Sequence, residues 1–166
     1  MPRSKRLLRL METELPRVSE QKRLLYRTTV DEVKYYYNII NEDIFRGKLI
    51  TPDIFVTPRC RGYWGICQAK YLLPDLKNKH ISNCAIKLMD KWYCQQWLIT
   101  TLAHEMCHQY QWDIEGPKRM RRGLEPIMSH GPSFFAHREK LANHGIPLRR
   151  AHRMRHWLKH QNLFKC

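Results

Sequence analysis

The six cysteines of the chain include no Cys-x-x-Cys pair; they stand at positions 60, 67, 84, 94, 107 and 166. Structural zinc sites favour cysteine pairs of that kind, so a zinc ribbon or finger is excluded. Their irregular scatter in a mid-sized chain also argues against a disulfide framework. It favours reduced thiols in the cytoplasm.

Long apolar segments are absent as well. The chain has no run of about 18 apolar residues that would predict a transmembrane helix. Its first nine residues carry charge without a following apolar stretch, which argues against a secretory signal peptide. We therefore expect no membrane partner and a cytoplasmic location, associated with the nucleoid or, for a phage-encoded protein, in the host cytoplasm.

Acidic residues are few. The chain has 15 Asp and Glu against 30 Lys and Arg, which gives a formal net charge of +15. Residues 117–166 hold twelve Lys or Arg and two acids, and residues 1–27 hold eight and three. A single surface Lys or Arg serves solubility, but an excess of this size favours a polyanion, since each neutralised phosphate releases counterions. We expect nucleic acid, with an anionic membrane surface or an acidic protein as alternatives.

The sequence does contain one zinc-hydrolase pattern, His-Glu-x-x-His, at residues 104–108. No Gly or Pro interrupts residues 93–112, so this stretch can form one long helix. Residues four apart share a helix face, which lets His104 and His108 bind one Zn²⁺. Glu105 can then reach the metal-bound water. The competing interpretation is a core helix whose histidines only form hydrogen bonds. In that case both rings need polar partners in the core, because an unpaired buried polar group is costly.

Catalytic zinc takes three protein ligands and keeps one open position. The metzincin pattern would need Gly and His where this chain has Gln111 and Ile114, so that class is excluded. His130, just ahead of a Gly-Pro turn, is the favoured third ligand, because the intervening loop can return the chain to the metal. Carboxylates remain open as alternatives: Asp113, Glu115, Glu125 and Glu139.

Four segments together resemble the SprT-like (Spartan-type) metalloprotease family. They are the helix motif at 102–110, the His-Gly-Pro-x-Phe motif at 130–134, the segment 37–49 and the aromatic, glycine-containing stretch 62–65. The resemblance covers residues 30–146. Without the zinc ribbon of many relatives, the chain is similar to a short bacterial or phage form of the domain.

The resemblance implies a role for four residues. His104, His108 and His130 would bind one zinc ion, and Glu105 would be the catalytic acid and base. The family's activity is zinc-dependent proteolysis of DNA-bound proteins, including proteins crosslinked to DNA. Two alternatives stay open: a non-catalytic, zinc-stabilised DNA-binding protein, and a zinc protease that acts on phage or host proteins independently of DNA.

The patterning predicts a small α+β fold of the zincin type, with a three- to four-stranded sheet packed beside the active-site helix. We expect a basic N-terminal arm (1–27), a SprT-like domain (28–146) and a basic C-terminal helix (147–166) packed on it. Within the domain we expect helices at 30–45 and 132–143, strands at 54–56, 63–69 and 84–89, and a loop at 113–129. The strand at 63–69 is the candidate sheet edge for binding an extended substrate. Its Trp64 is expected in the core rather than stacked on a base.

Contacts to DNA are predicted for two groups of basic residues. One lies in the 113–129 loop and the other at the start of the C-terminal helix. The candidates are Lys118, Arg119, Arg121, Arg122, Arg149, Arg150 and Arg153.

Overall fold

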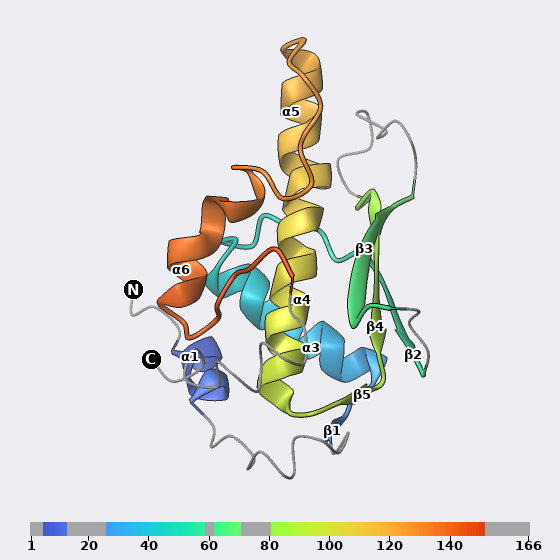
Figure 1. Cartoon of the computed structure of the whole chain (residues 1–166), viewed down its shortest axis with the longest axis vertical. Coiled ribbons are helices and arrows are strands. Elements are labelled where there is room, and N and C mark those ends of the chain that lie inside the picture. Colours follow the sequence, from blue (N-terminus) through green and yellow to red (C-terminus); the bar gives the residue numbers. More distant parts are fainter. Residues whose placement is uncertain (1–4, 13–25, 59–61, 71–80, 152–166) are drawn as a thin grey trace.

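One long helix, α4 (Gln95–Tyr110), lies at the centre of the structure, and the other elements pack around it (Figure 1). The structure, a computed structural model, describes residues 5–12, 26–58, 62–70 and 81–151. Every residue of α4 from Gln96 to Cys107 is buried. The fold therefore covers the polar side chains of this helix as well as its apolar ones.

A three-stranded sheet lies along one side of α4 (Figure 1). Its strands are β2 (Asp53–Thr57), β3 (Gly65–Ala69) and β4 (Cys84–Met89), in the order β2-β4-β3. β4 pairs in parallel with β2 and antiparallel with β3. The strand predicted at 84–89 is confirmed, and its side chains alternate: Ile86 and Leu88 are fully buried, while Lys87 lies on the other face. The predicted small α+β fold is therefore confirmed, and β3 is an edge strand of this sheet within the described residues.

Helix α3 (Val30–Asp43) crosses behind α4 and closes the core (Figure 1). It begins where the Thr29 side chain accepts a hydrogen bond from the Glu32 backbone N–H at 3.3 Å, a typical N-cap. It ends near Gly47, whose φ of 68° suits glycine. The Tyr37 hydroxyl lies 2.9 Å from Gln109 Oε1, which ties α3 to α4. The predicted helix at 30–45 is thus confirmed to within two residues.

The prediction of a loop at 113–129 is wrong for the first half of that segment, which is helical. The helix continues from α4 through a π-helical turn, Gln111–Glu115, into α5 (Gly116–Arg121), so that α5 prolongs the line of α4 (Figure 1). Gly116 N donates to the Gln111 carbonyl five residues back, and Pro117 occupies the first turn of α5, where its missing N–H is tolerated. Gly-Pro therefore marks a new helical turn here and not a stop.

The helix predicted at 132–143 is shorter and partly of another type. A 3₁₀ turn, Phe134–His137, leads into α6 (Arg138–Ala142). Gly145 follows the end of α6 with a φ of 75°, and its N–H donates to the Ala142 carbonyl at 2.9 Å, as in a glycine C-cap.

The two ends of the chain are described in part. Helix α1 (Arg6–Met11) packs on α3 through the buried side chains of Leu7 and Met11. A short pair of strands, β1 (Tyr26–Arg27) and β5 (Lys91–Trp92), runs antiparallel. Residues 147–151 are not helical, so the start of the predicted C-terminal helix is wrong, and its remainder from 152 lies outside the described residues. In this segment Leu148 is buried and Ala151 is exposed. Among the described residues, no helix has the length and apolar character to cross a membrane.

β3 and α4 approach each other closely at Gly65. A Cβ atom on Gly65 would lie 2.6 Å from Leu88 Cδ2 and 3.0 Å from Thr101 Cγ2. Contacts that short are repulsive, so only glycine lets the strand reach this position. The position matters because the same Cβ would lie 3.3 Å from Glu105 Cγ.

We expect Gly65→Ala to destabilise the fold by about 1–3 kcal/mol, because the added methyl overpacks a buried contact. Urea unfolding of the metal-free protein measures the change. Gln68→Ala, on an exposed position of the same strand, is the control and should stay within about 0.5 kcal/mol of the wild type. A Gly65→Ala protein as stable as the Gln68→Ala protein would show that the close approach is not required.

Candidate active site

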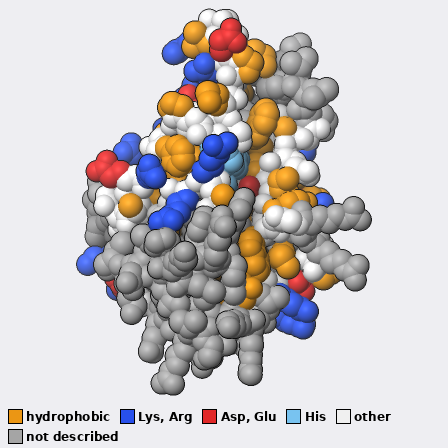
Figure 2. Space-filling model, in the orientation of Figure 1, with side chains coloured by type: hydrophobic (Ala, Val, Ile, Leu, Met, Phe, Trp, Pro, Cys, Tyr) orange, Lys and Arg blue, Asp and Glu red, His pale blue; other side chains and the backbone are white. Residues whose placement is uncertain are grey.

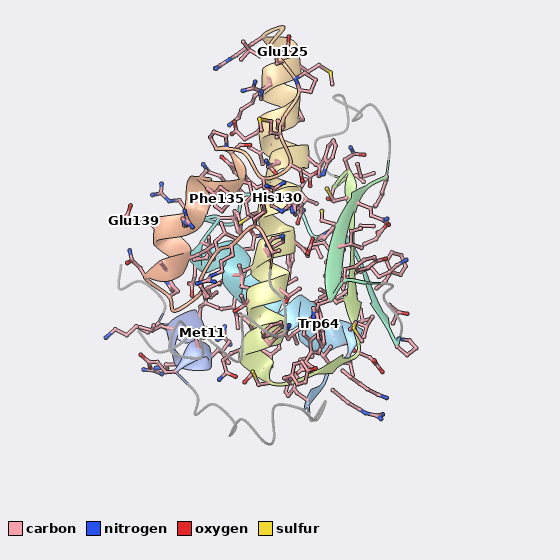
Figure 3. The ribbon with its side chains drawn as sticks, viewed as in Figure 1. Met11, Trp64, Glu125, His130, Phe135 and Glu139 are labelled. Atoms are coloured by element: carbon pink, nitrogen blue, oxygen red, sulfur yellow. The ribbon has the colours of Figure 1, made fainter. Side chains whose placement is uncertain are left out.

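Three histidines from two elements converge beside α4. His104 and His108 lie one turn apart on that helix, and His130 comes from the turn that precedes Phe134 (Figure 3). One ligand atom from each lies within 4.8 Å of the others, an arrangement that could hold a metal ion. The predicted candidates are therefore brought together, although they lie 26 positions apart in the sequence.

Phe134 forms the wall behind the three imidazoles. It is fully buried, and its ring centroid lies 4.8 Å from that of His104, 4.6 Å from His108 and 4.7 Å from His130. An aromatic ring in contact with all three leaves each imidazole little room to rotate. The last residue of the His-Gly-Pro-x-Phe motif thus holds the cluster in place, a role that the sequence did not predict.

Gly131 makes the His130 turn possible. A Cβ at this position would meet Met128 Cβ at 2.9 Å. The turn is closed by a hydrogen bond from Gly131 N to the Met128 carbonyl at 3.1 Å. The resulting tight turn points His130 toward α4.

Glu105 is buried between α4 and β3, with 5 % of its surface exposed. Burial raises the pKa of its carboxyl group to about 8, and a hydrogen bond from the Cys67 backbone N–H opposes that rise. A nearby metal cation would favour the carboxylate and lower the pKa again. Burial thus raises the pKa of this carboxyl group and a bound cation would lower it, so the two effects together favour a proton carrier near neutral pH.

The contact with Cys67 follows from the register of the sheet. Trp64 O accepts a hydrogen bond from Met89 N at 3.0 Å, and Lys70 N donates to Asn83 O at 2.7 Å. Alternate residues of β3 therefore bond to β4, so those between them, Gly65, Cys67 and Ala69, turn their backbone groups away from it. This unpaired edge of β3 faces the side of α4 that carries Glu105.

The protonation state of His108 and His130 suits metal binding. Burial lowers the pKa of His108 to about 4, while its hydrogen bond to Gln111 acts in the opposite direction. Burial and the charge of Arg150 lower the pKa of His130. Both rings are therefore neutral at pH 7, the form that binds metal. Nε2 of His130 is buried and has no hydrogen-bond partner, which is a property expected of a ligand atom.

The carboxylate alternatives for the third ligand lie elsewhere. Asp113 bonds to Ser82 and Asn83, and Glu115 bonds to Tyr110 and Lys118. Glu125 lies beyond the end of α5 and Glu139 on the far side of α6, both away from His130 (Figure 3). Within the described residues, no fourth His, Cys, Asp or Glu joins the three-histidine group.

The described basic residues predicted to contact DNA lie in two separate places in the structure. Lys118, Arg121 and Arg122 are exposed on and just after α5, whereas Arg119 donates from Nε to the Glu125 carbonyl at 2.8 Å. Arg149 and Arg150 follow α6, and Arg153 lies outside the described residues. In Figure 2 a histidine is visible near the centre of the face, with Lys and Arg side chains beside it and hydrophobic side chains on both sides.

The comparison with family models decides the relationship. The SprT-like family matches residues 33–154, which is most of the chain. The chain belongs to the SprT-like family. This SprT-like domain is of the metalloprotease type, and the described part of the chain contains three histidines that could hold a metal ion. No curated protein matches the chain.

We expect His130→Ala to bind zinc much more weakly than the wild type, by more than the roughly 10–100-fold that loss of an outer-shell partner costs. Glu125→Ala should bind zinc normally, since Glu125 lies far from the cluster (Figure 3). Metal content per chain after dialysis against a chelator measures both. Retention of zinc by His130→Ala together with its loss in Glu125→Ala would overturn the assignment of the third ligand.

Proposed function

We propose that the protein is a zinc-dependent endopeptidase that cleaves DNA-bound or DNA-crosslinked proteins. The observation that carries the peptidase part is the convergence of His104, His108 and His130 beside a buried Glu105, opposite the unpaired edge of β3. A general base, a metal site and a place for an extended peptide thus lie together.

Zinc is the metal that fits these residues. Three neutral imidazoles without a thiolate or carboxylate form a ligand set known from catalytic zinc sites. A closed structural site would need a fourth protein ligand, and the described part of the chain provides none near the three histidines. This favours a site with an open position over the non-catalytic alternative.

The chemistry divides between the metal and Glu105. A bound zinc ion would supply an activated water and polarise the scissile carbonyl. Glu105 accepts a proton from the attacking water and passes it to the leaving amine nitrogen, since its carboxyl group is held near neutral pKa and outside the ligand set.

β3 is the proposed binding strand for the substrate. The outward backbone groups of Gly65 and Ala69 can pair with an extended peptide whatever its sequence. A peptide bound there runs past Glu105, because Gly65 lies directly against that side chain. Sequence-independent cleavage of extended or unfolded segments follows from main-chain recognition of this kind.

The excess of positive charge supports DNA as the element that brings substrates to the enzyme. Arg150 is close enough to His130 to influence its pKa, so part of that charge lies beside the proposed active site. DNA bound along such a surface would place its associated proteins near the metal.

Glu105→Gln should cut peptide cleavage by about 10²–10⁴-fold while zinc content stays at the wild-type level, because the amide cannot carry the proton. Cleavage of an unstructured fluorogenic peptide, with zinc measured on the same sample, tests this. Glu115→Gln is the control, since Glu115 lies farther along the same helical line and bonds to Tyr110 and Lys118. Wild-type activity in Glu105→Gln would contradict the catalytic assignment.

Reversal of Lys118, Arg121 and Arg122 to Glu should weaken DNA binding and flatten its dependence on salt, by about 0.9 in the slope of log affinity against log salt for each lost phosphate contact. The matched control reverses Lys34, Arg46 and Lys48, three exposed residues on and after α3, and so has the same net charge. Equal losses in both proteins would mean that net charge and not this surface sets affinity. Salt-independent binding in the wild type would remove nucleic acid from the proposal.

A further inference from the structure

Gln111 connects the two elements that supply the histidines. It follows α4 as the first residue of the π-helical turn, and only 3 % of its surface is exposed. Its backbone carbonyl is engaged by Gly116 N, so the helical line continues beyond it while its side chain turns toward the His130 turn. π-helical turns of this kind are frequent at functional sites.

The Gln111 side chain uses both ends of its amide. Its Oε1 lies 3.1 Å from His108 Nδ1, and its Nε2 donates to the Met128 carbonyl at 2.9 Å and to Ser133 Oγ at 2.8 Å. Because Nε2 is committed to two acceptors, the amide orientation is fixed and Oε1 must face the histidine. His108 therefore donates from Nδ1, which leaves its Nε2 free to bind a metal.

The two acceptors of Gln111 flank His130 in the chain. The Met128 carbonyl also accepts the hydrogen bond that closes the turn at Gly131, and Ser133 precedes the 3₁₀ turn that carries Phe134. One buried amide thus fixes the ring orientation of His108 and holds both sides of the turn that carries His130.

Gln109 provides a contrast on the same helix. It is fully buried as well, but its amide bonds to Tyr37, Ser82 and Asp113 and to the Ile50 carbonyl. None of these groups belongs to the histidine cluster or its turn. The two glutamines are therefore alike in burial and different in what they hold.

We propose that Gln111 is a positioning residue of the metal site, which selects the His108 tautomer and fastens the His130 turn so that three imidazoles meet one ion. This inference rests on the proposed zinc site. Outer-shell partners of zinc-bound histidines commonly contribute about 10–100-fold to metal affinity.

The test compares Gln111→Met with Gln109→Met, since methionine matches the length of glutamine and forms no comparable hydrogen bonds. Zinc affinity is measured by chelator competition, and the thermal midpoint of each metal-free protein reports the fold. We expect both variants to lower the midpoint, but only Gln111→Met to weaken zinc binding, by about 10–100-fold. The absorption spectrum of the Co²⁺-substituted protein should also change in Gln111→Met alone.

Ser133→Ala tests the contact of Gln111 with the His130 turn apart from its contact with His108. This variant remains usable if Gln111→Met folds poorly. It removes one acceptor from Gln111 Nε2 and leaves His108 untouched, so zinc affinity should fall between wild type and Gln111→Met. The inference is overturned if Gln111→Met binds zinc within about threefold of the wild type, a factor below the outer-shell range. It is also overturned if Gln109→Met loses as much affinity.

These outcomes are separate from failure of the proposed function. A wild-type protein that binds zinc but cleaves no peptide would contradict the proposed peptidase function. The role of Gln111 in metal binding would still be tested by the zinc affinities of the variants. A wild type that binds no zinc would overturn both.

Discussion

Burial of the polar face of α4 is the constraint on which the surrounding structure depends. His104 and Glu105 are nearly inaccessible, and a charged or polar group in that position is costly unless neighbours satisfy it. The structure answers with specific contacts: a backbone N–H from Cys67 reaches Glu105, and an amide from Gln111 reaches His108. The raised pKa of Glu105 and the lowered pKa of His108 both follow from this burial. Three neutral imidazoles beside a largely buried carboxyl group, with a fourth metal position left for solvent, have the physical properties that metal-assisted hydrolysis requires.

Two further features let the other elements come close enough to supply those contacts. Gly65 allows β3 to lie directly against α4, and the π-helical turn carries the chain past Gln111 without breaking the helix. A second, partly buried network, in which Asp113 accepts hydrogen bonds from Ser82, Asn83 N and Gln109, fixes the start of β4 against the same turn. The sheet edge, the three-histidine group and the far end of the helix are therefore held as one unit.

Much of this could be predicted from local patterns. The His-x-x-x-His spacing, the absence of Gly and Pro from 93–112 and the alternation in β4 are short-range signals, and helix, strand and ligand candidates follow from them. The π-helical turn escaped prediction because Gly116-Pro117 resembles a loop, and only the hydrogen bond from Gly116 to Gln111 shows that the helix continues. Phe134 and Gly65 act through contacts between distant segments, which no spacing records. Gln111 did offer a signal, three residues after His108 on the same helix face, but its partners at 128 and 133 become apparent only in the fold.

The central claim is that three imidazoles, and no thiolate or carboxylate, hold the metal and leave a position open. Zinc K-edge X-ray absorption of the zinc-loaded protein tests it most directly. The structure predicts three imidazole nitrogens and one further light ligand from solvent at about 2.0–2.1 Å, with no sulfur neighbour. A sulfur neighbour at about 2.3 Å, or a shell with fewer than three imidazoles, would contradict it.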